Sequence, residues 1–208
     1  MIYKETKSLF LKKYQYKAVL VCPAAAGFRG GDFETALTDL KNYDLNASSI
    51  FGWKNKIKTH DDLQYSISLC ADLKNLNGIE TRVESPFISI YTNSIKDINL
   101  LKKRYADHVK YISKPAKSGQ LEEGVIVMPK MDFDFKVTLA ATKTEYSAFV
   151  QWAETNSKVK ITKSCKRDLS KNRSWGGTHF YVTGSNNLLM VKMHLGGCIA
   201  KIQRIIKE

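Results

Sequence analysis

The chain has 208 residues, 43% of them hydrophobic, a formal net charge of +13 and a sequence pI of about 9.5. This composition is typical of a folded globular chain and excludes a predominantly disordered one. No run of about 18 apolar residues occurs, and the N-terminus lacks the apolar core of a secretory signal. We therefore expect a cytoplasmic (intracellular) protein that makes no membrane contact.

The first half of the chain predicts one helix more than the second half. Its expected elements follow the order strand, helix, extra helix, strand, strand, helix, strand. The two middle strands are separated at Ser85-Pro86, because proline cannot continue a central strand. The expected ranges are 14–22, 33–43, 61–75, two runs within 79–91, 95–105 and 109–115.

The second half predicts the same order without the extra helix, after an additional short strand at 125–128. Alternation of Phe133, Phe135, Val137 and Leu139 indicates its first main strand. The other expected elements lie at 146–155, 158–162, 179–183, 188–195 and 199–206. The last segment also fits helical spacing, and its β-branched content favours a strand.

Two segments show the same order of expected elements and suggest an internal duplication. Residues 87–115 and 178–207 each read as a strand, a polar turn, an apolar-periodic helix and a closing strand. The sequence therefore predicts an α+β fold of two tandem ferredoxin-like (RRM-like) βαββαβ units, the first with an extra helix. The expected units are 1–115 and 125–208, joined by a linker at 116–124.

Cysteine and histidine spacing predicts neither a metal nor another cofactor. The four cysteines form no CxxC pair, and the four histidines form no HxH or HExxH motif. Catalytic residues are not assigned.

Positive charge is concentrated near the C-terminus. Residues 158–208 contain eleven Lys and Arg residues and two acids, whereas residues 116–157 contain four and six. A basic segment next to an acidic one is typical of a polyanion-binding surface. The alternative is a lysine-rich composition that only solvates the surface.

The basic stretch at 163–177, which joins the two middle strands of the second half, is the strongest candidate site. We expect it to form a long basic hairpin that pairs with phosphates, while nearby aromatic side chains stack on unpaired bases. Its candidate nucleic-acid-binding residues are Lys163, Lys166, Arg167, Lys171, Arg173, Trp175, His179 and Tyr181. The RNP1 pattern of RRM domains is absent.

Two sites in the first half are weaker candidates. Arg29 lies among glycines before an expected helix N-terminus, where backbone amides can meet a phosphate. The segment 51–58 interleaves aromatic residues with cations and contributes Trp53, Lys54, Lys56 and Lys58. Structural roles in a tight turn and a connecting loop are the alternatives.

Three functions remain open at this stage. The first is binding of nucleic acid, RNA rather than DNA, by the basic hairpin and a sheet face. The second is a protein-binding adaptor of viral or mobile-element type, which docks on a polymerase or another acidic partner, as part of a larger assembly. The third is a metal-independent endoribonuclease that uses His179, Tyr181 and Lys166.

Overall fold

A computed structural model describes residues 2–45, 52, 56–116 and 121–207. The chain forms two compact units, residues 1–120 and 121–208, here called the N-terminal and C-terminal units. Each is a mixed α+β unit with one five-stranded sheet. In the described part of the chain, no helix has both the length and the apolar character needed to cross a bilayer.

The sheet of the N-terminal unit has the strand order β1-β5-β2-β4-β3. Only β1 and β5 pair in parallel, and all other neighbours are antiparallel. The strands are β1 (Ile2–Thr6), β2 (Tyr16–Val21), β3 (Glu80–Glu84), β4 (Phe87–Thr92) and β5 (Val109–Pro115).

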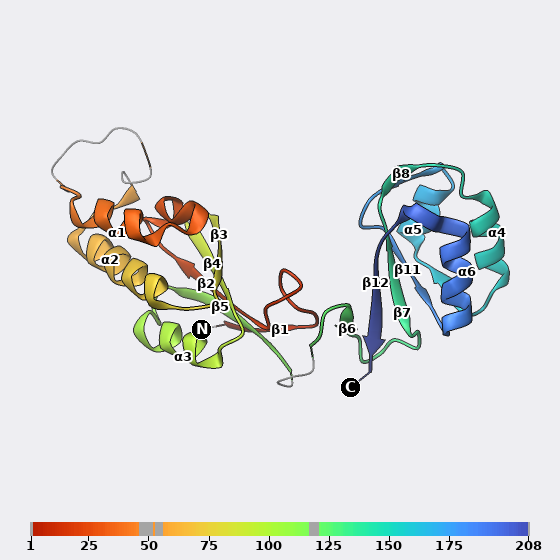
Figure 1. Ribbon diagram of the computed structural model, residues 1–208, viewed down its shortest axis with the longest axis horizontal. Coiled ribbons are helices and arrows are strands. Elements are labelled where there is room, and N and C mark those ends of the chain that lie inside the picture. The colour runs from red at the N-terminus through yellow and green to blue at the C-terminus, as the bar shows by residue number, and fades with distance from the viewer. Residues whose placement is uncertain (1, 46–51, 53–55, 117–120, 208) are drawn as a thin grey trace. The chain divides into compact units, whose positions relative to one another are not determined.

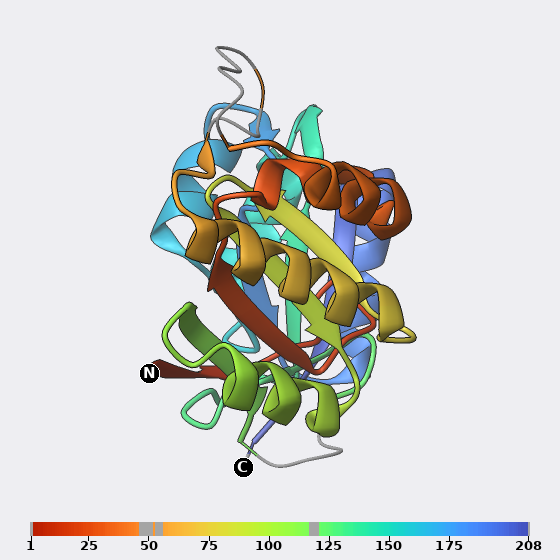
Figure 2. The ribbon, with the colours of Figure 1, turned by 90° about the vertical axis from the view of Figure 1, so that its left-hand side faces the viewer.

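Helices cover one face of this sheet, as Figure 2 shows. They are the 3-10 helix η1 (Ala25–Gly31), α1 (Phe33–Lys41), α2 (His60–Asn75) and α3 (Ile95–Arg104). Both α1 and α2 lie between β2 and β3, which confirms the predicted extra helix. The core between helices and sheet includes Leu20, Phe28 and Ile90, none of which is exposed to solvent.

The C-terminal unit repeats this arrangement with the strand order β6-β12-β7-β11-β9. Again only the outermost pair, β6 and β12, is parallel. The strands are β6 (Val125–Val127), β7 (Phe135–Leu139), β9 (Val159–Ile161), β11 (His179–Val182) and β12 (Ile199–Ile206). The segment 199–206, which was ambiguous in sequence, is thus a strand.

The helices of the C-terminal unit also lie on one side of its sheet (Figure 1). They are α4 (Ser147–Thr155), α5 (Lys163–Leu169), α6 (Ser185–Leu195) and the 3-10 turn η3 (Gly196–Cys198). Their core includes Phe149, Phe180 and Val191. The two segments predicted to repeat, β4-α3-β5 and β11-α6-β12, occupy the same positions in their sheets.

The basic stretch at 163–177 is not the open hairpin loop that the sequence predicted. It does connect two neighbouring antiparallel strands, β9 and β11, but its residues fold into α5 and a short strand, β10 (Arg173–Trp175). Strand β10 pairs with β8 (Ala141–Lys143) to form a two-stranded ribbon. Thr162 caps α5 by accepting a hydrogen bond from the backbone N–H of Cys165, and Cys165 and Leu169 are buried.

Phe180 tests the core of the C-terminal unit. Its side chain is fully buried, with its ring centroid 5.1 Å from that of Phe149. We expect Phe180→Ala to lower the free energy of unfolding by about 3–5 kcal/mol, because it removes a buried ring and leaves a cavity. Urea unfolding followed by circular dichroism measures this change.

The control for this prediction is Leu189→Ala, at an α6 side chain that is 59% exposed. Its effect should stay within about 0.5 kcal/mol. A cost below about 1 kcal/mol for Phe180→Ala would contradict the assigned core.

Candidate nucleic-acid interface

One face of the C-terminal sheet carries no helix among the described residues. On β11, Phe180 and Val182 enter the core, so His179 and Tyr181 point to the opposite face. Register places further side chains beside them, because residues paired across antiparallel strands share a face. This face, here called the C-terminal open face, consists of Lys136, Thr138, Lys160, His179, Tyr181, Lys201 and Gln203.

Two lysines at the centre of this face repel each other. Lys136 on β7 is paired with Gln203, and Lys201 on β12 is paired with the neighbouring Thr138. Partial burial and the charge of Lys201 both lower the pKa of Lys136. Neither ammonium has an ion-pair partner among the described residues, so the C-terminal open face holds positive charge that an anion would stabilise.

His179 adjoins these lysines. Burial lowers its pKa, the nearby charge of Lys136 lowers it further, and a hydrogen bond with the backbone of Gly177 opposes the shift. A nearby anion would reverse the effect of Lys136 and favour the charged imidazolium. His179 therefore holds its proton less tightly than an ordinary histidine.

Aromatic rings form a row on the same face. The ring centroid of Tyr181 lies 5.5 Å from that of His179 and 6.0 Å from that of Phe133. Tyr181 is only 8% exposed, so it supports its neighbours instead of offering a free ring face. His179 and Phe133 are half-buried and are the rings available for stacking.

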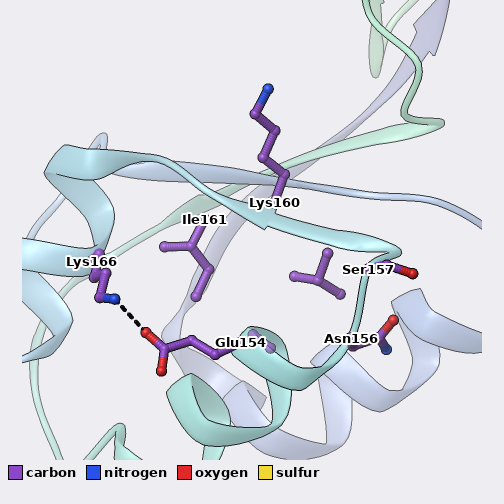
Figure 3. A pocket seen from close by; sticks show the side chains of 8 residues that line it. Glu154, Asn156, Ser157, Lys160, Ile161 and Lys166 are labelled. Atoms are coloured by element: carbon purple, nitrogen blue, oxygen red, sulfur yellow. Dashed lines mark ion pairs between the residues drawn. The ribbon is translucent and has the colours of Figure 1, made fainter.

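Neighbouring side chains of β9 point to opposite sides of the sheet. Lys160 extends to the side opposite Ile161, as Figure 3 shows. On the helix side, Ile161 lines a pocket of about 330 Å³ together with Glu154 and Lys166. The Nζ of Lys166 lies 2.6 Å from the Glu154 carboxylate, so this predicted phosphate contact already has a counterion.

The other predicted cations of the basic stretch are spread over α5 and the following turn. Lys163, Arg167 and Lys171 are exposed, and Arg167 makes a long contact of 3.8 Å with Asp168. Because Lys166 on the same helix contacts α4, α5 belongs to the helical layer. The cations of α5 therefore do not lie on the C-terminal open face.

The β8-β10 ribbon holds Arg173 and Trp175 close together. The Arg173 guanidinium lies 4.8 Å from the ring centroid of Trp175, which is 69% exposed. Both line a pocket of about 260 Å³ with Lys143, which is paired with Arg173. The Nε of Arg173 is buried without a hydrogen-bond partner among the described residues. This ribbon forms a separate two-stranded sheet, and its strand β10 packs against α5.

The candidates in the first half of the chain belong to the N-terminal unit. Arg29 is exposed at the end of η1, but the Asp32 carboxylate accepts a hydrogen bond from the N–H of Thr35 at the start of α1. That carboxylate disfavours a phosphate at the same helix N-terminus. Lys56 and Lys58 are exposed. Trp53 and Lys54 lie outside the described residues.

Comparison with known proteins identifies no relative. No protein-family model, no curated protein and no solved structure matches the chain. The described residues contain no cluster of three or more His, Cys, Asp or Glu side chains suited to a metal ion. The assignment of this site therefore depends on its own geometry.

Sequence reasoning missed Lys136 and Lys201. The alternation of Phe135, Val137 and Leu139 placed Lys136 on the other face of its strand. That Lys201 lies beside it follows only from the pairing of β7 with β12, which short-range patterns do not specify. Phe133 was assigned to the strand and not to the site.

The lowered pKa of His179 predicts a pH dependence of stability. Near pH 6 the unfolded chain, with an ordinary histidine pKa of 6.5, holds this proton more tightly than the folded protein. His179 therefore makes the free energy of unfolding rise with pH and level off once the pH is well above 6.5. Urea unfolding at several pH values from about 5.5 to 8 measures this rise.

The matched control is His179→Gln, which keeps a polar side chain and removes the titration. Its rise with pH should be smaller than that of the wild type, and the remainder reports on other groups. An equal or steeper rise in the variant would contradict the environment assigned to His179.

Proposed function

We propose that the protein binds single-stranded nucleic acid, RNA in preference to DNA, through the C-terminal open face. The observation that carries this proposal is the strand register, which places Lys136 and Lys201 on one face of neighbouring strands, where neither has an ion-pair partner among the described residues. Lysines of this kind pair with phosphates, and the adjacent rings of His179 and Phe133 stack on unpaired bases. Thr138 adds a hydroxyl suited to a base edge or a 2'-hydroxyl.

The fold is consistent with this proposal. Leaving out β1 and β6, each sheet orders the strands of a βαββαβ unit as fourth, first, third, second. On this basis we assign both units as ferredoxin-like, in tandem. RRM domains, which share this arrangement, bind RNA on the sheet face with aromatic residues on the central strands. His179 and Tyr181 lie on such a strand, β11.

A protein-binding adaptor is the second candidate, favoured by α6. Leu189 and Met193 are one helical turn apart and are 59% and 71% exposed. Exposed apolar side chains at this spacing suit docking against a protein partner. The positive charge of the surface would in addition attract an acidic partner, such as a polymerase with an acidic surface.

The endoribonuclease hypothesis loses one of its three residues. Lys166 is ion-paired with Glu154 in the helical layer, whereas Lys136 lies beside His179. Among the cysteines, burial raises the pKa of Cys22 to about 11 and those of Cys70 and Cys165 to about 12. These three thiols are therefore protonated at neutral pH and are poor nucleophiles.

Two triple variants that remove equal charge test the proposed interface. One changes the C-terminal open face, at Lys136, Lys160 and Lys201, to alanine. The other changes α5, at Lys163, Lys166 and Arg167, to alanine. We expect the first to lower the slope of log K against log[salt] for single-stranded RNA by about 2, because each phosphate contact contributes about 0.7. The second should change the slope much less.

Fluorescence anisotropy with labelled single-stranded RNA, single-stranded DNA and duplex at several salt concentrations gives these slopes. RNA binding by the wild type that does not depend on salt would contradict the phosphate contacts, and no RNA binding near physiological salt would sink the proposal and favour a protein partner. Equal effects of the two variants would show that total charge, and not the C-terminal open face, governs binding.

A further inference from the structure

The N-terminal sheet also has a face without a helix among the described residues. On β2 and β4, Ala18, Leu20, Ile88 and Ile90 enter the core and are fully buried. The intervening side chains point to the other face, and register brings neighbouring strands alongside them. This N-terminal open face includes Lys4, Lys17, Phe87, Tyr91, Lys110 and Tyr111, while Val19, Ser89 and Ser113 at its centre are buried.

Ammonium groups lie over the aromatic rings of this face. The Nζ of Lys4 is 3.9 Å from the ring centroid of Tyr111, and that of Lys110 is 3.8 Å from the centroid of Phe87. Lys17 lies between Tyr91 and Tyr111, at 5.5 and 5.6 Å from their centroids. None of the three lysines has an ion-pair partner among the described residues. The face therefore offers rings and unneutralised cations together.

The same lysine-tyrosine pair occurs at the same place in both units. Lys17 on β2 is paired with Tyr91 on β4, and Lys136 on β7 is paired with Tyr181 on β11. These strands are the first and third of each βαββαβ unit, and they lie side by side at the centre of each sheet. An aromatic residue from the segment before the first strand packs on each tyrosine. Phe10 lies 5.8 Å from Tyr91, and Phe133 lies 6.0 Å from Tyr181.

We propose that the N-terminal open face is a second platform for single-stranded nucleic acid. This inference rests on the proposed function of the C-terminal open face. Single-stranded nucleic acid is the occupant that matches the chemistry, because its phosphates pair with lysines and its bases stack on rings. An acidic protein would satisfy the lysines but would leave the stacking surface unused.

The arrangement of charge predicts where the strand contacts this face. Tyr91 is only 5% exposed, so the half-buried rings of Phe87 and Tyr111 are the candidates for stacking, where a base would displace the ammonium groups of Lys110 and Lys4. On β3, Glu84 is ion-paired with Arg82, and Glu80 opposite Tyr91 leaves this edge with one excess negative charge. The backbone of the nucleic acid should therefore lie over β5 and β1, where Lys4 and Lys110 are.

A lysine triple variant of the full chain tests this inference. Lys4, Lys17 and Lys110 are changed to alanine, and the control changes Lys41, Lys96 and Lys103, which are exposed on α1 and α3, to alanine. Binding is measured against single-stranded RNA of about 4 and about 20 nucleotides at several salt concentrations. On the long strand, the open-face variant should lower the salt slope by about 2 relative to the control.

A second variant, Tyr111→Leu, tests stacking without a change of charge. It should weaken binding of the long RNA by roughly fivefold or more, because a base loses its stacking partner. Unchanged circular dichroism and unfolding midpoints in each variant show that the fold is kept.

The outcomes separate this inference from the proposed function. Suppose that the wild type binds RNA and that the C-terminal triple variant binds it more weakly. If the N-terminal triple variant then binds as its control does, and Tyr111→Leu binds as the wild type does, the second platform is overturned while the first stands. If the wild type binds neither RNA, both are overturned. A reduced slope for the N-terminal triple variant on the long strand supports the second platform.

Discussion

The two-layer arrangement of each unit determines where a ligand can bind. Helices cover one face of each five-stranded sheet, and that face takes the aliphatic and aromatic core. Because side chains alternate along a strand, every residue that enters the core forces its neighbours to the opposite face. The residues placed there on β11 and β7 are histidine, tyrosine, lysine and threonine, and a second core could not use them. The proposed interface thus consists of the side chains that alternation along the strands places on the face opposite the core.

The charge of the C-terminal open face indicates which kind of ligand it would bind. Cationic side chains that solvate a surface usually stand apart or next to acids, as Lys166 does beside Glu154. On the C-terminal open face, by contrast, Lys136 and Lys201 are held together by strand pairing, with His179 next to Lys136. Keeping like charges close lowers stability, and a bound polyanion removes that cost.

Much of the architecture was predictable from the sequence, because it is written in local patterns. The strand that ends before Pro23, the break at Ser85-Pro86 and the closing strands of both units were predicted close to their observed places. The N-terminal strand β1 was missed, since its residues are mostly exposed and show no buried face. Helix α5 was missed because its many cations suggested a loop. The signal was present in Thr162 as a cap and in Cys165 and Leu169, four residues apart and both buried.

The site was predictable only in part. The sequence pointed to His179 and Tyr181 but grouped them with the cations of α5, which lies in the helical layer. The lysines that adjoin them come from β7 and β12, which are distant in sequence and meet only through the strand order. Pairing between distant segments is therefore the information that short-range patterns lacked.

Chemical-shift mapping is the most direct test of the central claim. Backbone amide resonances of the full chain would be followed while a single-stranded RNA is added at near-physiological salt. The account predicts saturable shifts centred on β7, β11 and β12, at Lys136, His179 and Lys201, with small shifts along α6. Shifts centred on Leu189 and Met193 of α6, or no saturable shifts at all, would contradict it.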